Sequence, residues 1–465
     1  MFQRHRTALF LLGVAMLLAS VAIPAPEGLG TEGFRCLGVF ATCVLFWVTN
    51  VMPLAVTSLA VLALLPLLGV LSPDESFALF GNRAVFFILG ALVLAASMIS
   101  TGLSSRLALL MVSRFGRSAR TFLLGVLLSS GFLSFWMPEH AVAAMMFPVV
   151  LEVARVLELE PRKSRYGAAL FLALAWGAVI GGIATLLGGA RNPLAIAILY
   201  QTTGHTVEFF EWMRAAVPLV LVLLAVTAFL LDRMARRDPV DIEPCREVLH
   251  RKLQEAGPLS AAEKRLAWIG GATILAWMTL GHTVGLAQIS ILSAVLLFVF
   301  RVADWPSVEE NVNWGIIVMY GGAVALGSAL VESGAAHWLA VLIASHGALG
   351  PVALLLGLAA VTIVLTEGIS NSAAVAVILP IALSLAEYRG IHSDRLVVFV
   401  VALPAGLAFC LPMGSPPNAI AYSSGYFRLR DILILGMFLK LVGLALMLVL
   451  MIWVWPRFGL TFVGG

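Results

Sequence analysis

Charge is scarce in this chain. Of its 465 residues only 12% are Asp, Glu, Lys or Arg, whereas 61% are hydrophobic and the mean hydropathy is +1.02. A soluble core cannot hide so much apolar surface, so a soluble protein is excluded and an all-α, multi-pass membrane protein is predicted. The net charge of +4 is small, and no basic patch of the kind that binds nucleic acid is present. The expected surroundings are the lipid bilayer.

Cysteine is also rare, and motifs for catalysis are missing. The four cysteines, Cys36, Cys43, Cys245 and Cys410, have no zinc-binding spacing and suggest no disulfide framework. The sequence contains no Walker motif, no Ser-His-Asp grouping and no haem or metal-cluster spacing. It therefore gives no support for ATP-driven transport, and we expect the chain not to be an enzyme.

Apolar runs predict eleven membrane-crossing helices and two helical hairpins that enter and leave by the same side. The helices are expected near 7–23, 34–51, 54–71, 84–101, 165–187, 212–232, 264–282, 285–301, 313–331, 394–410 and 430–455. The hairpins are expected near 121–157 and 350–386. Residues 102–118 and 332–346 are less hydrophobic and are predicted to lie along the membrane interface. The polar stretch 233–263 is predicted to be a connecting loop.

Basic residues gather in the connections on one side of this arrangement, and the positive-inside rule places that side in the cytoplasm. They include Arg4, Arg6, Arg106, Arg114, Arg117, Arg120, Arg162, Lys163 and Arg165, with the stretch 232–265. The opposite connections carry carboxylates instead, among them Glu27, Glu32, Asp74, Glu75, Glu208 and Glu211. We therefore expect a bacterial inner membrane or its equivalent, with the N-terminus in the cytoplasm and the C-terminus outside.

The second hairpin contains a polar break, Ser370-Asn371-Ser372, between two apolar segments that are each predicted to be too short to cross a bilayer. Unsatisfied backbone groups at membrane depth cost on the order of several kcal/mol each, so the break predicts a binding site. The first hairpin holds a second copy. Aligning its Pro148 with Pro380 (380 − 148 = 232) places Glu139 on Asn371 and His140 on Ser372.

A further pair of polar breaks lies in 181–192 and 408–418. Setting Asn192 on Asn418 (418 − 192 = 226) places Gly188 on Gly414. The two offsets are close enough to indicate one duplication. Each copy has an odd number of crossings, so the copies are predicted to be inverted, with hairpin tips that meet near the membrane midplane. The N-termini of the interrupted helices suit an anion, and their freed carbonyls suit a cation.

These features resemble the divalent anion/sodium symporter family, also called DASS, which carries dicarboxylates, citrate or sulfate. The similarity covers nearly the whole chain and includes 52–59, 101–109, the tip at 370–372 and Gly414-Ser-Pro-Pro-Asn418. The resemblance implies a homodimeric elevator, in which a transport domain moves against a fixed scaffold. By analogy 1–118 and 264–348 form the scaffold, 119–232 and 349–465 the transport domain, and 233–263 the cytoplasmic connection.

The resemblance also assigns roles at the site. A sodium site maps onto four hard oxygen ligands, from the Thr366 hydroxyl, the Ile369 carbonyl, the Asn371 side chain and the Gly414 backbone. A degenerate second sodium site keeps Ser134 and Gly188. The predicted substrate contacts are Glu139, His140, Gly189, Ala190, Arg191, Asn371, Ser372, Ser415 and the Pro416 backbone.

The first half of the site departs from the family pattern, with Pro138-Glu139-His140 in place of Ser-Asn-Thr and Ala190-Arg191-Asn192 in place of Pro-Pro-Asn. A Glu139 carboxylate would repel a dianion by about 4 kcal/mol at about 4 Å for a dielectric constant of about 20. Three answers are open. Arg191 could pair with Glu139 and replace the sodium ion, His140 could supply the counter-charge and make transport proton-dependent, or Glu139 could itself carry a proton.

The leading hypothesis is secondary transport of a small divalent anion, a C4-dicarboxylate, coupled to sodium, with a proton as the alternative or additional coupling ion. The altered half-site then predicts a lower sodium stoichiometry, proton coupling or exchange. Sulfate is an alternative substrate. A sodium/proton antiporter or arsenite-type permease, in which Glu139 and His140 carry protons, is an alternative function, and so is a receptor that has lost transport. The charged residues could also be a locked ion pair at a dead half-site.

Overall fold

The apolar runs fold into helices. The computed structural model describes residues 2–345 and 349–461, and within them the chain is helical with no strand. The helices are α1 (Phe2–Ala22), α2 (Thr31–Thr49), α3 (Leu54–Leu67), α4 (Pro73–Phe80), α5 (Arg83–Ser100), α6 (Leu103–Arg114), α7 (Ala119–Leu133), α8 (Glu139–Val156), α9 (Arg165–Gly181), α10 (Arg191–Thr203), α11 (Phe209–Ala235), α12 (Glu243–Glu255), α13 (Ala261–Leu280), α14 (Leu286–Val299), α15 (Trp305–Asn311), α16 (Trp314–Glu332), α17 (Ala335–Ser345), α18 (Pro351–Gly368), α19 (Asn371–Tyr388), α20 (Asp394–Ala402), α21 (Pro416–Ser423) and α22 (Leu429–Val449). Three short 3₁₀ helices among the described residues are η1 (Pro404–Gly406), η2 (Pro412–Gly414) and η4 (Trp455–Phe458), and η3 (Leu450–Val454) is a short π-helix.

Seven helical segments among the described residues are long and apolar enough to cross a membrane. They are Thr31–Thr49, Pro73–Ser100, Phe209–Ala235, Trp314–Glu332, Pro351–Gly368, Asn371–Tyr388 and Leu429–Phe458. The prediction of an all-helical membrane protein is therefore confirmed. Two of the seven are α18 and α19, with 18 residues each. The prediction that each half of this hairpin is too short to cross is wrong by length, because the apolar run extends to both sides of the polar break.

Several elements differ from the predicted boundaries. α9 ends at Gly181 and α20 at Ala402, earlier than expected, because the chain leaves helical geometry before each glycine-containing break. The stretch 233–263, predicted to be a loop, contains the helix α12. Two buried side chains, Cys245 and Leu249, hold this helix against the rest of the protein. Hydropathy did not predict α12, because its composition is polar and few of its residues face the interior.

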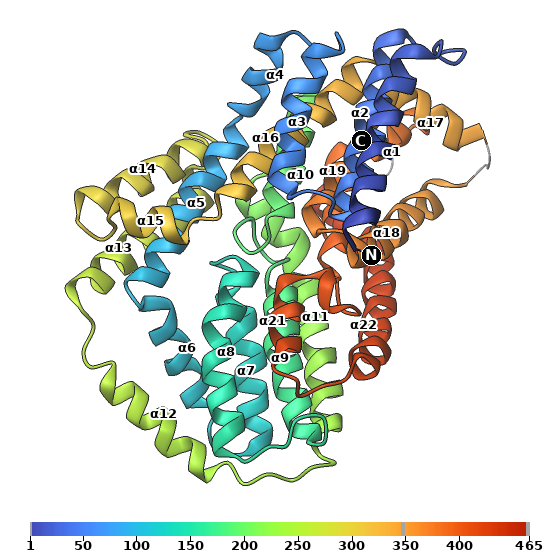
Figure 1. The fold of residues 1–465 in the computed structure, drawn as a ribbon. Coiled ribbons are helices and arrows are strands. Elements are labelled where there is room, and N and C mark those ends of the chain that lie inside the picture. Colours follow the sequence, from blue (N-terminus) through green and yellow to red (C-terminus); the bar gives the residue numbers. More distant parts are fainter. Residues whose placement is uncertain (1, 346–348, 462–465) are drawn as a thin grey trace.

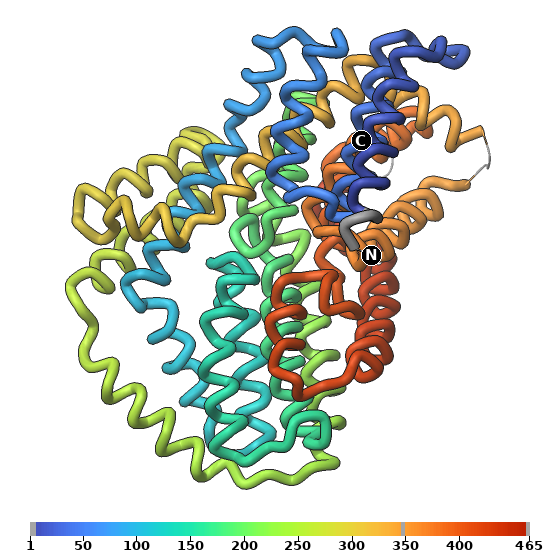
Figure 2. The backbone as a smooth tube through the Cα atoms, in the orientation of Figure 1, coloured from blue at the N-terminus to red at the C-terminus, as the bar shows by residue number. Residues whose placement is uncertain are grey.

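The two hairpins approach each other from opposite ends of the molecule. In Figure 1, α7 and α8 rise from the lower end beside α9, whereas α19 occupies the upper half beside α17. The smooth trace in Figure 2 shows the upper and lower groups of helices joined through the centre by the chain around α9 and α10. The helix pairs α5 and α14, α3 and α16, and α7 and α9 pack together, so segments distant in sequence form each group.

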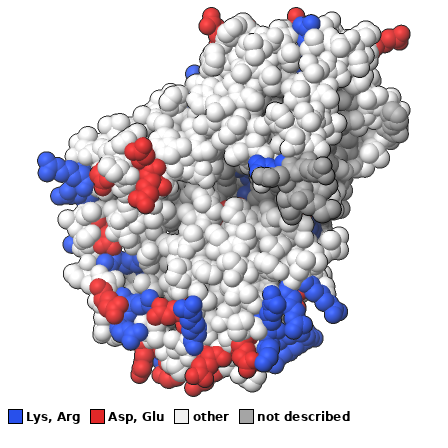
Figure 3. All heavy atoms as spheres, viewed as in Figure 1, with Lys and Arg blue, Asp and Glu red and all other residues white. Residues whose placement is uncertain are grey.

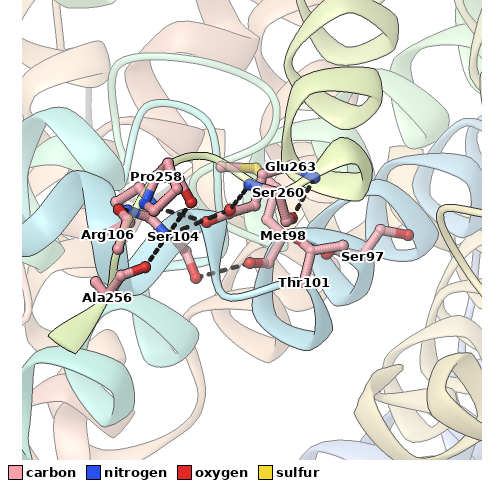
Figure 4. A network of polar contacts seen from close by, with 10 residues as sticks. Ser97, Met98, Thr101, Ser104, Arg106, Ala256, Pro258, Ser260 and Glu263 are labelled. Atoms are coloured by element: carbon pink, nitrogen blue, oxygen red, sulfur yellow. Dashed lines mark hydrogen bonds and ion pairs between the residues drawn. The ribbon is translucent and has the colours of Figure 1, made fainter.

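Charged side chains are unevenly distributed over the molecule. Figure 3 shows Lys and Arg concentrated toward the lower end of the view, with few at the upper end. Arg106 of α6 holds the connection between α12 and α13 (Figure 4). Its Nε lies 2.6 Å from Glu263 Oε1, and its guanidinium donates to the Ala256 and Gly257 carbonyls at 2.6 Å each. The same Glu263 accepts the Ser260 N–H and completes a capping box at the start of α13.

Candidate functional site

A cavity of about 840 Å³ lies where the two hairpin tips meet. All the predicted substrate contacts line it, together with Ile369 and the two glycines of the predicted sodium sites; they are Glu139, His140, Gly188, Gly189, Ala190, Arg191, Asn371, Ser372, Gly414, Ser415 and Pro416. The opposite wall comes from α2, α3, α5 and α16, with Trp47, Leu54, Ile88 and Ile316. The structure thus brings the four polar breaks together, although they are far apart in the chain.

Four helices begin at this cavity. α8 starts at Glu139, α10 at Arg191, α19 at Asn371 and α21 at Pro416. In the second half, side chains cap the helices, since Ser370 Oγ accepts the Ala373 N–H at 3.1 Å and Ser415 Oγ accepts the Asn418 N–H at 3.4 Å. In the first half, Pro138 and Ala190 occupy the N-cap positions and provide no such acceptor. The partial positive charge at these four helix N-termini favours a bound anion.

Glu139 and Arg191 form a buried ion pair beside the cavity. Arg191 Nη1 lies 3.1 Å from Glu139 Oε2, and the two residues are 1% and 6% exposed. Glycines make room for them, because a Cβ at Gly189 would lie 2.6 Å from Arg191 Nη1 and one at Gly406 would lie 2.5 Å from Nη2. Arg191 Nε and Nη2 have no hydrogen-bond partner among the described residues. A permanent cation therefore occupies the first half of the site, and two of its three nitrogens are buried without a partner among the described residues.

Asn371 connects the two halves, and its amide fits in two orientations. In one, its nitrogen donates to Glu139 Oε1 at 3.4 Å while its oxygen faces Thr366 Oγ1 at 2.6 Å and the Gly414 carbonyl at 3.0 Å. In the other, the nitrogen donates to those two oxygens and the oxygen accepts from Arg191 Nη1 at 3.2 Å. The choice of orientation thus links the Glu139–Arg191 pair to the second half of the site.

The second half offers the oxygen atoms that a sodium ion needs. In the first orientation the Asn371 oxygen, Thr366 Oγ1 and the Gly414 carbonyl converge, and the Thr366 hydroxyl can donate to the Ala405 carbonyl at 2.7 Å. Hydroxyl, amide and carbonyl oxygens are ligands that hard cations prefer, so these residues are compatible with sodium in the first orientation, whereas in the second orientation hydrogen bonds alone satisfy them. Ile369, the fourth predicted ligand, ends α18 in extended conformation at the cavity wall.

The first half offers a poorer oxygen cluster. The Gly188 carbonyl accepts the Glu139 N–H at 2.9 Å, and Ser134 Oγ is buried with no hydrogen-bond partner among the described residues. Gly188 packs so closely that a Cβ there would lie 2.2 Å from the Ser134 carbonyl. One of the two predicted oxygen ligands is therefore already used by the backbone that carries Glu139.

The two breaks share a bonding pattern at their asparagines. Asn192 Nδ2 donates to the Gly182 and Thr185 carbonyls at 2.9 and 2.6 Å. Asn418 Nδ2 donates to the Ala408 and Leu411 carbonyls at 2.8 and 3.3 Å. The acceptors lie 10 and 7 residues before the asparagine in both cases. Each asparagine thus closes the non-helical loop that precedes its own helix.

The sequence patterns did not reveal the pairing of Glu367 with Lys440. Glu367 Oε1 lies 2.7 Å from Lys440 Nζ, on α22. The Glu367 carboxylate also accepts the N–H groups of Phe409, Cys410 and Leu411 at 2.7 to 2.9 Å. It therefore holds the interrupted chain ahead of η2 in place. An apolar helix with a single lysine was the available signal, since such a charge at membrane depth needs a partner.

His140 and Ser372 face the cavity without partners. Both line its wall, and neither side chain forms a hydrogen bond or ion pair with another described residue. Neither group is required to hold the tips together, so both are available to a ligand. The structure thus places every predicted substrate contact at one cavity, and it leaves Thr366 and Ser134 buried behind the wall.

The family model described as the sodium:sulfate symporter transmembrane region matches residues 4–461. The chain belongs to this family. Sodium-dependent dicarboxylate transporters named SdcS from Staphylococcus aureus strains RF122 / ET3-1 and NCTC 8325 / PS 47 are each 29% identical over 472 aligned residues, which cover 96% of this chain and 90% of theirs. This member of the symporter family is accordingly a membrane transporter and not an enzyme.

Two solved structures share the fold of this symporter-family chain. MtrF of Neisseria gonorrhoeae, described among antimetabolite efflux pumps, superposes with a TM-score of 0.58 at 14% identity and covers 97% of this chain and 95% of its own. The YdaH transporter of Alcanivorax borkumensis has a TM-score of 0.52 at 16% identity and covers 80% of this chain and 85% of its own. At these identities the likeness concerns the fold alone.

Proposed function

We propose that the chain is a sodium-coupled secondary transporter of a small divalent anion, a C4-dicarboxylate, in the inner membrane. The relatives named as sodium-dependent dicarboxylate transporters support the substrate class. The cavity supports an anion, because four helix N-termini open onto it. The hydroxyls of Ser372 and Ser415 and the Asn371 amide lie at the same wall and provide hydrogen-bond donors for carboxylate oxygens.

The observation that carries the altered-site part of the proposal is the 3.1 Å contact between Arg191 Nη1 and Glu139 Oε2. It favours the first of the three answers, in which Arg191 neutralises Glu139 and stands in place of a sodium ion. A guanidinium stays charged through the whole cycle, so the first half needs no added cation. A sodium ion would then add its positive charge only in the second half of the site, at Thr366, Asn371 and Gly414. This arrangement implies one sodium ion per substrate fewer than a site that keeps both predicted sodium ions.

We further propose an elevator made of two inverted repeats. The matched Asn192 and Asn418 bonding patterns and the meeting of the hairpin tips support the repeats. The cavity separates the proposed scaffold, 1–118 and 264–348, from the proposed transport domain, 119–232 and 349–465, as a sliding interface requires. The stretch 233–263, with α12, connects them on the cytoplasmic side. A homodimer is proposed from family membership.

Purified protein in liposomes with imposed sodium, proton and counter-substrate gradients tests the proposal. Inward sodium should drive succinate uptake by the native protein with fewer than two sodium ions per substrate, and an imposed proton gradient alone should drive none. Uptake by the native protein that needs two or more sodium ions would overturn the substitution of sodium by Arg191. Sodium efflux that no dicarboxylate or sulfate affects would instead favour the antiporter hypothesis.

A further inference from the structure

The charges at the cavity do not suit a free dianion. Among the described residues that line it, the ionisable side chains are Glu139, Arg191 and His140. Glu139 and Arg191 cancel each other, so with His140 neutral the cavity has no net charge of its own. One sodium ion at the second half adds a single positive charge, whereas an unsubstituted dicarboxylate brings two negative charges. The second negative charge then meets only the partial charges of the helix N-termini in a largely apolar cavity, which is costly.

The two ends of the cavity also differ in chemistry. The second tip presents hydrogen-bond donors, from Ser372, Ser415 and the start of α19, which suit carboxylates. The first tip presents an acceptor, because the Glu139 carboxylate opens onto the cavity. Its Oε2 is held by Arg191, but its Oε1 has only the long 3.4 Å contact with Asn371 Nδ2. In the second amide orientation even that contact is lost, because the Asn371 oxygen then faces Glu139.

An acceptor with spare capacity calls for a positively charged donor on the ligand. His140 is adjacent to Glu139, lines the same wall and has no partner among the described residues. An imidazole nitrogen and a carboxylate oxygen together can accept from an ammonium group. Arg191 Nε and Nη2 are buried against Gly406, so they take no part in this recognition.

We propose that Glu139 recognises an ammonium group, so that the substrate is an amino-substituted C4-dicarboxylate with a net charge of −1. The inference rests on the proposed dicarboxylate transport and narrows its substrate class. One sodium ion then balances one substrate, and the loaded site is neutral. Glu139 is the residue that discriminates the amino-substituted acid from the unsubstituted one, since the two differ only in the group that faces it.

The probes are L-aspartate and succinate, which share the four-carbon dicarboxylate skeleton. Binding to the purified full-length protein in sodium chloride is measured by isothermal titration. Trp47 and Trp136 line the cavity, so intrinsic fluorescence provides a second readout. We expect the native protein to bind L-aspartate at least about tenfold more tightly than succinate, which corresponds to about 1.4 kcal/mol. Native protein that prefers succinate would overturn the inference without any variant.

Two variants separate recognition from folding. Glu139→Gln removes the charge and should abolish or reverse the preference for L-aspartate, whereas Glu139→Asp keeps the charge and should retain a preference. Glu387→Gln, at an exposed position outside the cavity, is the matched control and should leave the ratio unchanged. A Glu139→Gln ratio equal to the native one overturns the inference. Succinate binding without L-aspartate binding overturns the inference alone, and binding of neither overturns the proposed dicarboxylate function as well.

Discussion

At the scale of single residues, the protein contains two buried ion pairs with different surroundings. Glu139 and Arg191 lie at the cavity wall, and Glu139 has no backbone N–H donor to its carboxylate among the described residues. Glu367 and Lys440 lie behind the cavity wall and do not line it, and Glu367 accepts three backbone N–H groups. Burying charge is costly unless partners satisfy it. The well-satisfied pair therefore supports the backbone, and the less satisfied pair is the one placed to respond to a ligand.

Removing either cation should destabilise the protein, but only one removal should affect binding. Arg191→Met leaves Glu139 buried without its counter-charge and should cost about 3–5 kcal/mol of unfolding free energy. Lys440→Met should cost less, because three N–H groups still stabilise the Glu367 carboxylate. Denaturant unfolding in detergent measures the free energy of unfolding of both variants.

Ligand binding distinguishes the two pairs further. Arg191→Met should weaken dicarboxylate binding by at least about tenfold relative to the native protein, a change of about 1.4 kcal/mol. Lys440→Met should leave the ratio of L-aspartate to succinate affinity unchanged. Arg430→Met, at an exposed position, controls for the loss of a positive charge and should be neutral in both measurements. Equal binding by Arg191→Met and native protein would identify the cavity pair as purely structural.

At the scale of elements, the site depends on helices that stop and restart. α9 ends before Gly188 and α10 begins after it, which allows the first tip to approach within backbone contact distance. The Gly188 carbonyl accepts the Glu139 N–H, so the break and the tip form one unit. The corresponding Gly414 sits against Glu367, where a Cβ would lie 2.7 Å from Oε2. Glycine is needed at these two positions for close approach, not for flexibility.

Alanine substitution tests this close approach. Gly188→Ala would place a Cβ 2.2 Å from the Ser134 carbonyl, a backbone atom that cannot rotate away. Overpacking of this kind costs about 1–3 kcal/mol or more, and the displaced tip should also weaken ligand binding. Gly368→Ala is the matched control at the other tip, since no atom lies within 4 Å of its Cβ position. The melting temperatures of the two variants are measured with and without ligand. Equal melting temperatures for Gly188→Ala and Gly368→Ala would contradict the close approach at Gly188.

At the scale of the whole molecule, two cavities lie at helix ends that the charge pattern assigns to opposite sides. The rim of the larger cavity includes Asn50 and Asn313, at ends of α2 and α16 that the charge distribution assigns to the cytoplasm. A second cavity of about 440 Å³ lies near Asn82, Thr283 and Gln288, at ends assigned to the outside. Leu186 and Pro193 line both cavities and separate them. This arrangement of the two cavities is the one that the proposed elevator would have when its site faces the proposed cytoplasmic side.

Single reporter cysteines test this orientation. All four native cysteines are buried, so background labelling by a membrane-impermeant maleimide should be low. Asn313→Cys should react from the cytoplasmic side and Thr283→Cys from the outside, because both positions are exposed. Maleimide labelling of the two variants is compared in inside-out and right-side-out vesicles. Reaction of both from the same side would contradict the proposed topology.

Much of this arrangement could be read from residue patterns. Apolar runs placed the helices, and the paired breaks around Asn371 and Gly414 identified the site, because polar groups inside a membrane need partners. Lys440 was missed because its partner Glu367 lies 73 positions away (440 − 367 = 73) and no periodic pattern links them. Gly406, which makes room for Arg191, was missed because a single glycine in an apolar stretch carries no distinctive signal.

The sequence alone determined that this chain is a helical membrane protein with two pairs of interrupted segments, because hydropathy and local breaks are properties of short stretches. Tertiary structure decided which of the three answers to the Glu139 problem is favoured. Whether a carboxylate meets Arg191, His140 or neither depends on where two separate half-helices end in space. That placement follows from packing of distant segments against one another, which local sequence does not encode.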